Sequence, residues 1–213
     1  MSSIFEKNGR RILFVHVPKA GGTSVRHMLE SVGWKSLPNP IVPPSAIIKK
    51  ELNGPRDSNH QHAKIRERWI GSWDYEFAIV RNPYDRILSR AKQQARDLGL
   101  QEIEEINFFA WVDDILQRVI KEEGPGAEDN HYRPQHQFVS ENTKVFRLED
   151  QKDDLLQDLR QQNIISEEVS LGVFNKSFYK SREYSFCWDR QTLIHKDFLS
   201  YYREDFKKFG YKI

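Results

Sequence analysis

Hydrophobic residues gather in a few short runs, each bounded by residues that favour turns. Residues 11–17 (Arg-Ile-Leu-Phe-Val-His-Val) and 75–80 (Tyr-Glu-Phe-Ala-Ile-Val) are almost continuously apolar and contain several β-forming residues. Such runs predict strands that are buried on both faces, as in a parallel sheet. Residues 144–148 are a third strand candidate. Because helical patterns follow these runs, the order of elements predicts an α/β domain.

Helical spacing and end signals predict where the helices lie. Asn82 follows the second strand at once and suits an N-cap, with Pro83 at the first helical position. Gly99 predicts the end of that helix near residue 98. The sequence also predicts helices at 108–120, 150–159 and 192–209, a short one at 46–52, and a polar one at 62–69.

The totals are those of one ordinary globular domain. The chain has 213 residues, of which 38% are hydrophobic and 30% are charged. No repeat or linker interrupts it, so we expect one domain over residues 1–213. The expected fold is a single P-loop-like α/β domain with a central parallel sheet flanked by helices. The net charge of +2, from 33 basic and 31 acidic side chains, argues against bulk binding of nucleic acid.

Cysteine content and hydropathy argue against a disulfide-bonded, zinc-binding or membrane-spanning protein. Cys187 is the only cysteine, which excludes an intramolecular disulfide and a cysteine-rich zinc site. No run of about 18 apolar residues suggests a membrane span, and residues 1–11 do not resemble a signal peptide. We therefore expect a cytoplasmic protein. The sequence assigns no oligomeric state.

Residues 18–24 (Pro-Lys-Ala-Gly-Gly-Thr-Ser), called the 18–24 loop below, are the most informative stretch. Adjacent glycines between a strand and a helix allow main-chain N–H groups to point at an anion. The start of the helix adds further N–H donors, and Thr23 or Ser24 is expected to cap it. Lys19 supplies a mobile positive charge. The loop therefore predicts a phosphate site, and a simple structural turn is the less favoured alternative.

The loop differs from the nucleoside-triphosphate loop, in which lysine directly follows the last glycine. Here Lys19 precedes Gly21 and Gly22. The 18–24 loop resembles instead the 5′-phosphosulfate-binding loop of sulfotransferases that use 3′-phosphoadenosine 5′-phosphosulfate (PAPS). The resemblance implies that the donor's 5′ end is held by the following residues: Lys19, Ala20, Gly21, Gly22, Thr23 and Ser24.

A second segment, residues 77–89, is similar to the 3′-phosphate motif of the same family. The resemblance implies that Arg81 and Ser89 grip the 3′-phosphate of the donor. The physical chemistry agrees, because the carboxyl edge of a strand is where α/β proteins bind ligands, and guanidinium matches phosphate oxygens. Taken alone, the segment would equally fit a capped helix with surface arginines.

The acceptor needs a base, for which histidine is suited near neutral pH. His60 and His62 resemble the His-x-His pair of heparan sulfate 2-O-sulfotransferase and its relatives, among them short bacterial members. This implies His62 as the base and His60 as its helper or substitute. A pair at this spacing would also suit a metal on an extended segment. No third ligand stands out, so we expect no metal.

Two other segments are weaker candidates. Residues 131–138 look like the His-x-x-Pro-Gln segment of carbohydrate sulfotransferases, which implies His131, Arg133 and Gln135 near the acceptor; a polar loop is an equal alternative. Lys180 and Arg182 lie in a basic, aromatic stretch that in the family closes over the donor, although a solvated surface would look the same. The aromatic residues of the 108–111 segment fit a core better than an acceptor cleft.

Together these patterns predict a soluble PAPS-dependent O-sulfotransferase, in which the product is 3′-phosphoadenosine 5′-phosphate (PAP). The predicted partner is a hydroxyl-bearing acceptor, a carbohydrate. Lys19 is expected to stabilise the charge on the departing phosphate. Two alternatives remain at this stage: a nucleotide-dependent kinase on a related scaffold, and a binding module without catalysis. Titration with PAP and ATP would distinguish the sulfotransferase from the kinase. A turnover assay would distinguish it from the binding module.

Overall fold

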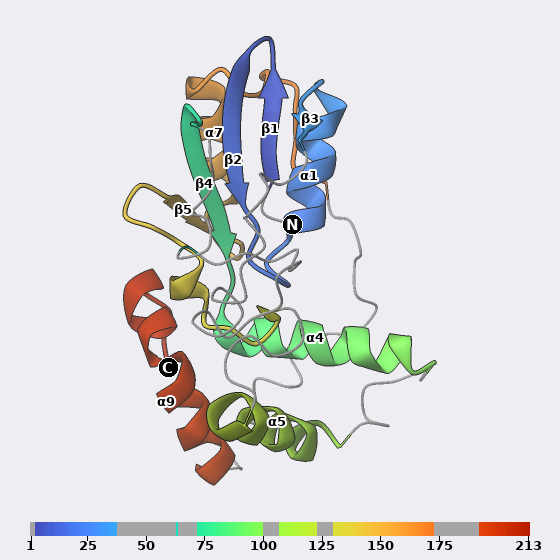
Figure 1. Ribbon diagram of the computed structural model, residues 1–213, viewed down its shortest axis with the longest axis vertical. Coiled ribbons are helices and arrows are strands. Elements are labelled where there is room, and N and C mark those ends of the chain that lie inside the picture. The colour runs from blue at the N-terminus through green and yellow to red at the C-terminus, as the bar shows by residue number, and fades with distance from the viewer. Residues whose placement is uncertain (1–2, 38–62, 64–71, 100–106, 123–129, 173–191) are drawn as a thin grey trace, which may run out of the picture.

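A five-stranded mixed sheet forms the upper part of the molecule (Figure 1). The computed structural model describes residues 3–37, 63, 72–99, 107–122, 130–172 and 192–213. The strands run in the order β3-β1-β2-β4-β5. Their bounds are β1 Ser3–Lys7, β2 Arg10–Val15, β3 Lys35–Ser36, β4 Tyr75–Val80 and β5 Lys144–Arg147.

The three strands that lead to the site are parallel, as the apolar runs predicted. β2 pairs with β4, and β4 pairs with β5. These strands form the predicted central parallel part of the sheet, and β1 and β3 add an antiparallel edge to it. Asn8 and Gly9 both have positive φ, 52° and 78°, and form the two-residue turn between β1 and β2. An Asn-Gly pair suits such a hairpin turn.

Helices cover one face of the sheet and extend beyond its carboxyl edge (Figure 1). Their bounds are α1 Gly22–Ser31, α4 Pro83–Asp97, α5 Phe108–Gln117, α7 Lys152–Gln161 and α9 Thr192–Phe209. A π-helical segment, η2 Arg118–Glu122, continues α5, and a short 3-10 turn, η3 Gln135–Gln137, precedes β5. The helices predicted at 46–52 and 62–69 lie outside the described residues, apart from Ala63.

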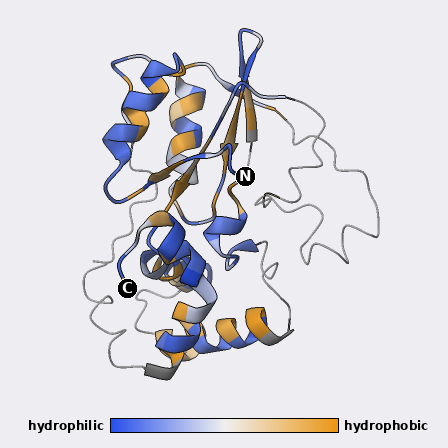
Figure 2. Ribbon diagram, turned by 90° about the vertical axis from the view of Figure 1, so that its left-hand side faces the viewer, coloured by the Kyte–Doolittle hydropathy of each residue, from blue (hydrophilic) through white to orange (hydrophobic). Residues whose placement is uncertain are grey.

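The two faces of the sheet pack into different cores. Phe14 of β2 and Phe77 of β4 face α1 and α7 in one cluster. Their neighbours Val15 and Ala78 face the opposite side, against Phe138. Because both faces are covered, the strands contain few polar positions, and they are coloured as hydrophobic in Figure 2. A third cluster joins α4, α5 and α9.

Helix α4 begins and ends as the sequence predicted. The Asn82 side chain accepts a hydrogen bond from the Tyr84 N–H, Pro83 is the first helical residue, and Leu98 caps the end before Gly99. The predicted cap of α1 was wrong. Gly21, with φ of 87°, is the N-cap and supplies no side-chain hydrogen bond. Thr23 and Ser24 lie inside the first turn, so no hydroxyl occupies the cap position.

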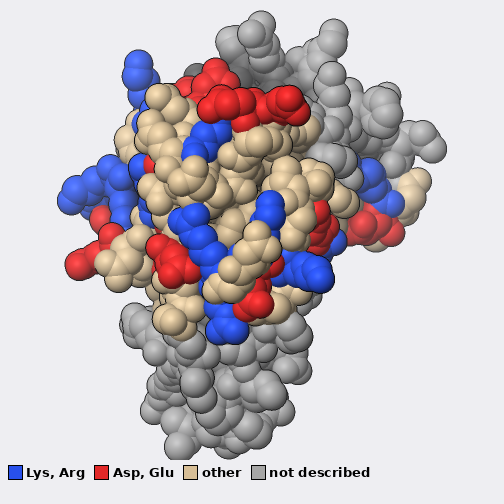
Figure 3. All heavy atoms as spheres, turned by 90° about the horizontal axis from the view of Figure 1, so that it is seen from above, with Lys and Arg blue, Asp and Glu red and all other residues tan. Residues whose placement is uncertain are grey.

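Charge is evenly distributed over the face drawn in Figure 3. Lys and Arg side chains are interspersed with Asp and Glu over its described part. This agrees with the small net charge of the chain.

Candidate functional site

The two segments that are predicted to bind phosphate meet at the carboxyl edge of the parallel strands. Val15 of β2 is paired with Ala78 of β4, so the 18–24 loop and Arg81 leave the sheet side by side. A direct contact joins them, because the Arg81 Nη1 donates to the Lys19 carbonyl oxygen at 3.4 Å. Ligands of open α/β sheets bind at this edge. The structure thus brings together two segments that are about 60 residues apart in sequence.

Both glycines of the loop are required by their surroundings. Gly21 has φ of 87°, and a Cβ added there would lie 3.2 Å from Leu148 Cδ1. A Cβ on Gly22 would lie 2.1 Å from both Cδ2 and Nε2 of His16. Any side chain at position 22 would therefore displace the His16 ring, which stacks on Phe14. Within the loop the Ala20 N–H donates to the Val17 carbonyl oxygen at 3.3 Å and the Ser24 N–H donates to the Gly21 carbonyl oxygen at 3.0 Å.

Lys19 lies in a cluster of positive charges. Its ammonium donates to Gln93 Oε1 of α4 at 2.6 Å. The pKa of Lys19 is lowered from 10.5 to about 8, mainly by burial and then by the nearby charges of Arg90, Arg96 and Arg81 in that order, while Asp97 opposes the shift. Like charges this close raise one another's electrostatic energy. The cluster will therefore attract an anion that carries several negative charges.

The other predicted donor residues lie close to this cluster. Ser89 is half-buried on α4, between Arg86 and Arg90 in sequence. Ala20 and Ser24 are 1% and 8% exposed, whereas Thr23 is exposed. Their roles in holding a donor stay predictions.

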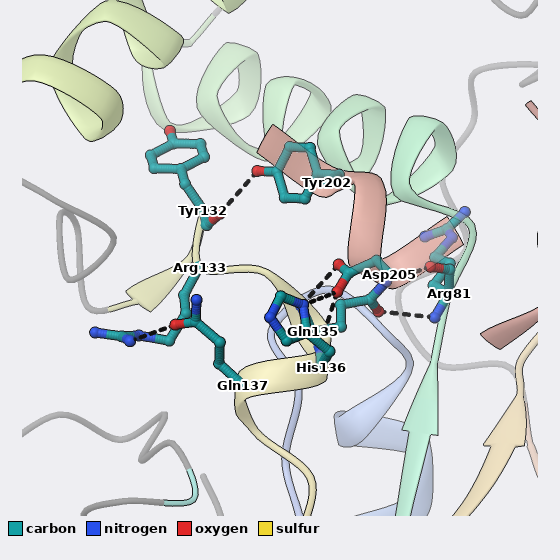
Figure 4. Close-up of polar contacts among 8 residues, drawn as sticks. All are labelled: Arg81, Tyr132, Arg133, Gln135, His136, Gln137, Tyr202 and Asp205. Carbon is teal, nitrogen blue, oxygen red and sulfur yellow. Dashed lines mark hydrogen bonds and ion pairs between the residues drawn. The ribbon is translucent and has the colours of Figure 1, made fainter. Parts of the chain in front are cut away.

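The end of β4 is held by the predicted acceptor segment (Figure 4). The Arg81 N–H donates to Gln135 Oε1 at 2.9 Å, and Gln135 Nε2 donates to the Arg81 carbonyl oxygen at 2.6 Å. Gln135 is fully buried. Its amide thus pairs with the main chain of Arg81 much as a neighbouring strand would, and this fixes the direction in which Arg81 leaves the sheet. Contact of Gln135 with an acceptor hydroxyl stays a prediction.

A buried carboxylate holds this segment from the other side. Asp205 of α9 is fully buried and accepts from the N–H groups of Gln135 and His136, at 2.7 and 2.8 Å (Figure 4). It also bonds His136 Nδ1 at 2.8 Å. The His136 side chain is 27% exposed. The arrangement orients the imidazole, which makes His136 a histidine of interest that the sequence did not single out.

Arg133 is also more enclosed than expected. It is 5% exposed, and its guanidinium donates to Asn130 Oδ1 at 2.8 Å and to Gln137 Oε1 at 2.6 Å. Burial lowers the pKa of Arg133 to about 10, so it remains a cation at neutral pH. His131 is half-buried. Binding of an anionic sugar by these two residues stays a prediction.

Several predicted residues lie outside the described part of the chain: His60, His62, Lys180 and Arg182. The aromatic residues at the start of α5 can be placed. Phe108 is buried in the helical core, and Phe109 and Trp111 pack against it. This favours the core interpretation over an acceptor cleft.

A family model described as "Sulfotransferase family" matches residues 3–212. The chain belongs to the sulfotransferase family. The match covers nearly the whole chain and confirms the resemblance that the two phosphate motifs suggested.

Curated relatives of this sulfotransferase-family chain include carbohydrate sulfotransferase 10 of Danio rerio and of Xenopus laevis. Each is 30% identical over 95 residues, which are 44% of this chain and 26% of the relative. The match therefore spans about a quarter of the length of these relatives. No solved structure matches the chain significantly.

Within the described residues, no helix has the length and apolar character needed to cross a membrane. Over the same residues, no group of three or more His, Cys, Asp or Glu side chains is arranged to hold a metal ion.

Sequence reasoning missed Arg86 and Asp205, each of which bonds main-chain groups far away in sequence. Arg86 appeared only as one of several surface arginines, yet it is 3% exposed. A usable signal existed for Asp205. It lies at the helical spacing of Phe198, Tyr202 and Phe209, on the buried face of α9. A carboxylate at an apolar-face position indicates a buried polar contact.

Proposed function

We propose that this protein transfers a sulfuryl group from PAPS to a hydroxyl group of a carbohydrate. Membership of the sulfotransferase family supports the reaction class. The names of the two curated relatives support a carbohydrate acceptor. The arrangement of the 18–24 loop beside Arg81 supports a donor with phosphate groups at both ends.

One observation carries the proposal: Lys19, whose carbonyl oxygen contacts Arg81, lies near two further cations, Arg90 and Arg96, of which Arg90 also pairs with Asp97 at 3.8 Å. Arg81, Arg90 and Arg96 are near enough to lower the pKa of Lys19. Gathering these cations raises the free energy of the folded protein. A donor with a 5′-phosphosulfate and a 3′-phosphate would relieve that repulsion. The absence of side chains at Gly21 and Gly22 fits the same ligand.

Each protein group has a defined part in the proposed reaction. The 18–24 loop and Lys19 hold the 5′ end of the donor, and Arg81 with Ser89 holds the 3′-phosphate. In the transfer, a bond forms between sulfur and the acceptor oxygen while the bond between sulfur and the phosphate oxygen breaks. His62 takes the proton of the acceptor hydroxyl. Lys19 stabilises the negative charge that develops on the phosphate.

Calorimetric titration with PAP and with ATP tests the donor. We expect PAP to bind more tightly than ATP, because ATP lacks the 3′-phosphate. Tighter binding of ATP would favour the kinase alternative. A turnover assay with labelled PAPS and a panel of carbohydrates then tests the activity, since a binding module would bind PAP and transfer nothing.

Replacement of Arg81 by methionine tests the 3′-phosphate assignment. Loss of a charge-assisted hydrogen bond to phosphate is expected to weaken PAP binding about 10- to 100-fold. Binding of adenosine 5′-phosphate should change much less, because that ligand has no 3′-phosphate. Arg147→Met is a matched control, since Arg147 ends the neighbouring strand β5 but pairs with Asp150. An equal loss for both nucleotides would contradict the assignment.

The lowered pKa of Lys19 predicts how PAP binding depends on pH. In the free protein the Lys19 ammonium loses its proton as the pH rises through about 8. A bound phosphate favours the ammonium, so above pH 8 binding must take up a proton. PAP affinity should therefore fall above pH 8, approaching about tenfold per pH unit.

Calorimetry at pH 7, 8 and 9 measures this dependence. Lys19→Met is the control, because it removes the titrating group and should flatten the alkaline part of the profile. A wild-type affinity that stays constant from pH 7 to 9 would contradict the prediction, as would the same slope in the variant.

A further inference from the structure

Arg86, in the first turns of α4, joins two segments that are distant in sequence. Its side chain is 3% exposed. Its Nε donates to the Pro18 carbonyl oxygen at 2.9 Å, and its Nη2 donates to the His131 carbonyl oxygen at 2.8 Å. One guanidinium therefore connects the 18–24 loop to the start of the predicted acceptor segment, residues 131–138.

Burial of this cation needs an explanation. Burial lowers the pKa of Arg86, while the neighbouring Asp205, Tyr201 and Tyr202 oppose that effect. Removing a guanidinium from water costs several kcal/mol unless its donors are satisfied. A leucine or methionine would fill the same position among the apolar residues of α4 without that cost. The donors of Arg86 are thus the property that distinguishes it.

The carbonyl group of Pro18 belongs to the peptide that precedes Lys19, and Lys19 has unusual backbone geometry. Its φ is 66°, in the left-handed region that residues other than glycine seldom adopt. Such a conformation costs of the order of 1 kcal/mol and persists only when neighbouring groups impose it. The peptide on the other side of Lys19 is held as well, because its carbonyl oxygen accepts from Arg81 Nη1.

We propose that Arg86 is a positioning residue. It holds the Lys19 backbone in its left-handed conformation, and it fixes the position of the 18–24 loop relative to the segment of residues 131–138. This inference rests on the proposed function, since it assigns Arg86 a part in placing Lys19 against the donor. Arg86 acts through Lys19 and need not touch the donor. Displacements of about 1 Å in such groups are enough to reduce transfer rates strongly.

The same side chain also links the donor side to the predicted acceptor side. The His131 carbonyl lies near the start of the segment whose Gln135 holds the end of β4. Arg86 and Gln135 therefore fix this segment at two points, one on the 18–24 loop and one on Arg81. The distance between donor and acceptor positions is set by these two contacts together with Asp205.

A double-mutant cycle on PAP binding tests the inference. The four proteins are the wild type, Arg86→Lys, Lys19→Ala and the double variant, and calorimetry gives the dissociation constant of each. If Arg86 acts through Lys19, Arg86→Lys should weaken PAP binding about tenfold in the wild-type background and less than twofold in the Lys19→Ala background. A purely structural role would give the same factor in both backgrounds, which would overturn the inference.

Arg160→Lys is the matched control. Arg160 of α7 also donates to two main-chain carbonyls, those of Glu167 and Val169, but it has no contact with the 18–24 loop. Its replacement should leave PAP affinity unchanged. Arg86→Gln is a second variant, which keeps one donor. If neither Arg86 variant folds while Arg160→Lys does, Arg86 serves the fold rather than the site, and the inference is overturned.

The outcomes for Arg86 and for the proposed function can be told apart. Failure of the wild type to bind PAP would remove the proposed function, and this inference with it. Wild-type binding of PAP with equal factors in the two backgrounds would overturn only the role of Arg86.

Discussion

Replacing Lys19 by alanine is expected to lower kcat/KM for sulfuryl transfer about a thousand-fold, the loss typical of removing one donor that stabilises developing negative charge. The ammonium lies near Arg90, Arg96 and Arg81, and its hydrogen-bond partner Gln93 is neutral. Because Gln93 is neutral, it holds the Lys19 ammonium less strongly than a carboxylate would. The ammonium can therefore exchange Gln93 for an anionic ligand at a small cost in free energy. The measurement is steady-state turnover of labelled PAPS with an active acceptor.

The same position predicts an opposite effect on stability. The pKa of Lys19 is lowered in the folded protein, to about 8 from 10.5, so the ammonium is less stable there than in the unfolded chain. The resulting destabilisation is fully present below pH 8 and is lost as the pH rises from about 8 to 10.5. Lys19→Met, which keeps the methylene groups, should therefore raise the free energy of unfolding at pH 7 by about 1–3 kcal/mol.

Thermal unfolding of Lys19→Met at pH 7 and at pH 10 checks this result. Tm should rise at pH 7 and change much less at pH 10. A lower Tm at pH 7 would contradict the prediction, because it would mean that the Lys19 ammonium stabilises the fold. Lys19→Arg is the control that keeps the charge, and it should not gain stability at either pH.

Much of the fold was predictable because the signals are local. β4 and α9 begin and end at the predicted residues, Tyr75–Val80 and Thr192–Phe209. α4 agrees at both ends because Asn82, Pro83 and Gly99 each act through their own backbone preferences. The prediction of the α1 cap was wrong because a residue distant in sequence lies beside it. Gly21 is the N-cap with φ of 87°, and a Cβ there would lie 3.2 Å from Leu148 Cδ1, so glycine stands where a hydroxyl residue was expected.

The contacts that organise the site were not predictable in the same way. Arg86 reaches carbonyl groups 68 and 45 residues away in sequence, and Asp205 bonds N–H groups 70 and 69 residues away. A single sequence shows that a charge lies on a helix, but not which carbonyl or N–H approaches it. The two predicted phosphate motifs could be recognised because each consists of residues that are close together in sequence. Their supports come from other segments, and only the folded chain brings them together.

Replacing His62 by alanine is expected to lower kcat about 10²- to 10⁴-fold, the usual contribution of a general base. PAP affinity should remain within about twofold of the wild type, because the base acts on the acceptor and not on the nucleotide. His60→Ala should have a smaller effect if His60 is the helper. The measurements are turnover and calorimetric PAP binding for each variant.

His136 provides the sharpest comparison for this assignment. A buried carboxylate that bonds one ring nitrogen is the arrangement by which enzymes orient a catalytic imidazole, and Asp205 does this for His136 Nδ1. No hydrogen bond to the other nitrogen, Nε2, is found among the described residues. His136→Gln keeps an N–H for Asp205 but removes the base, so it separates orientation from proton transfer.

If His62 is the base, His136→Gln should retain turnover within about threefold of the wild type, and the acid limb of the pH–rate profile should persist. The reverse pattern would assign the base to His136: turnover and the acid limb would be lost in His136→Gln and kept in His62→Ala. In that case the base is carried by the same turn that, through Gln135, holds Arg81. Asp205 would then orient the base and fix the donor-binding strand through one carboxylate, and Asp205→Asn would lower both turnover and PAP affinity.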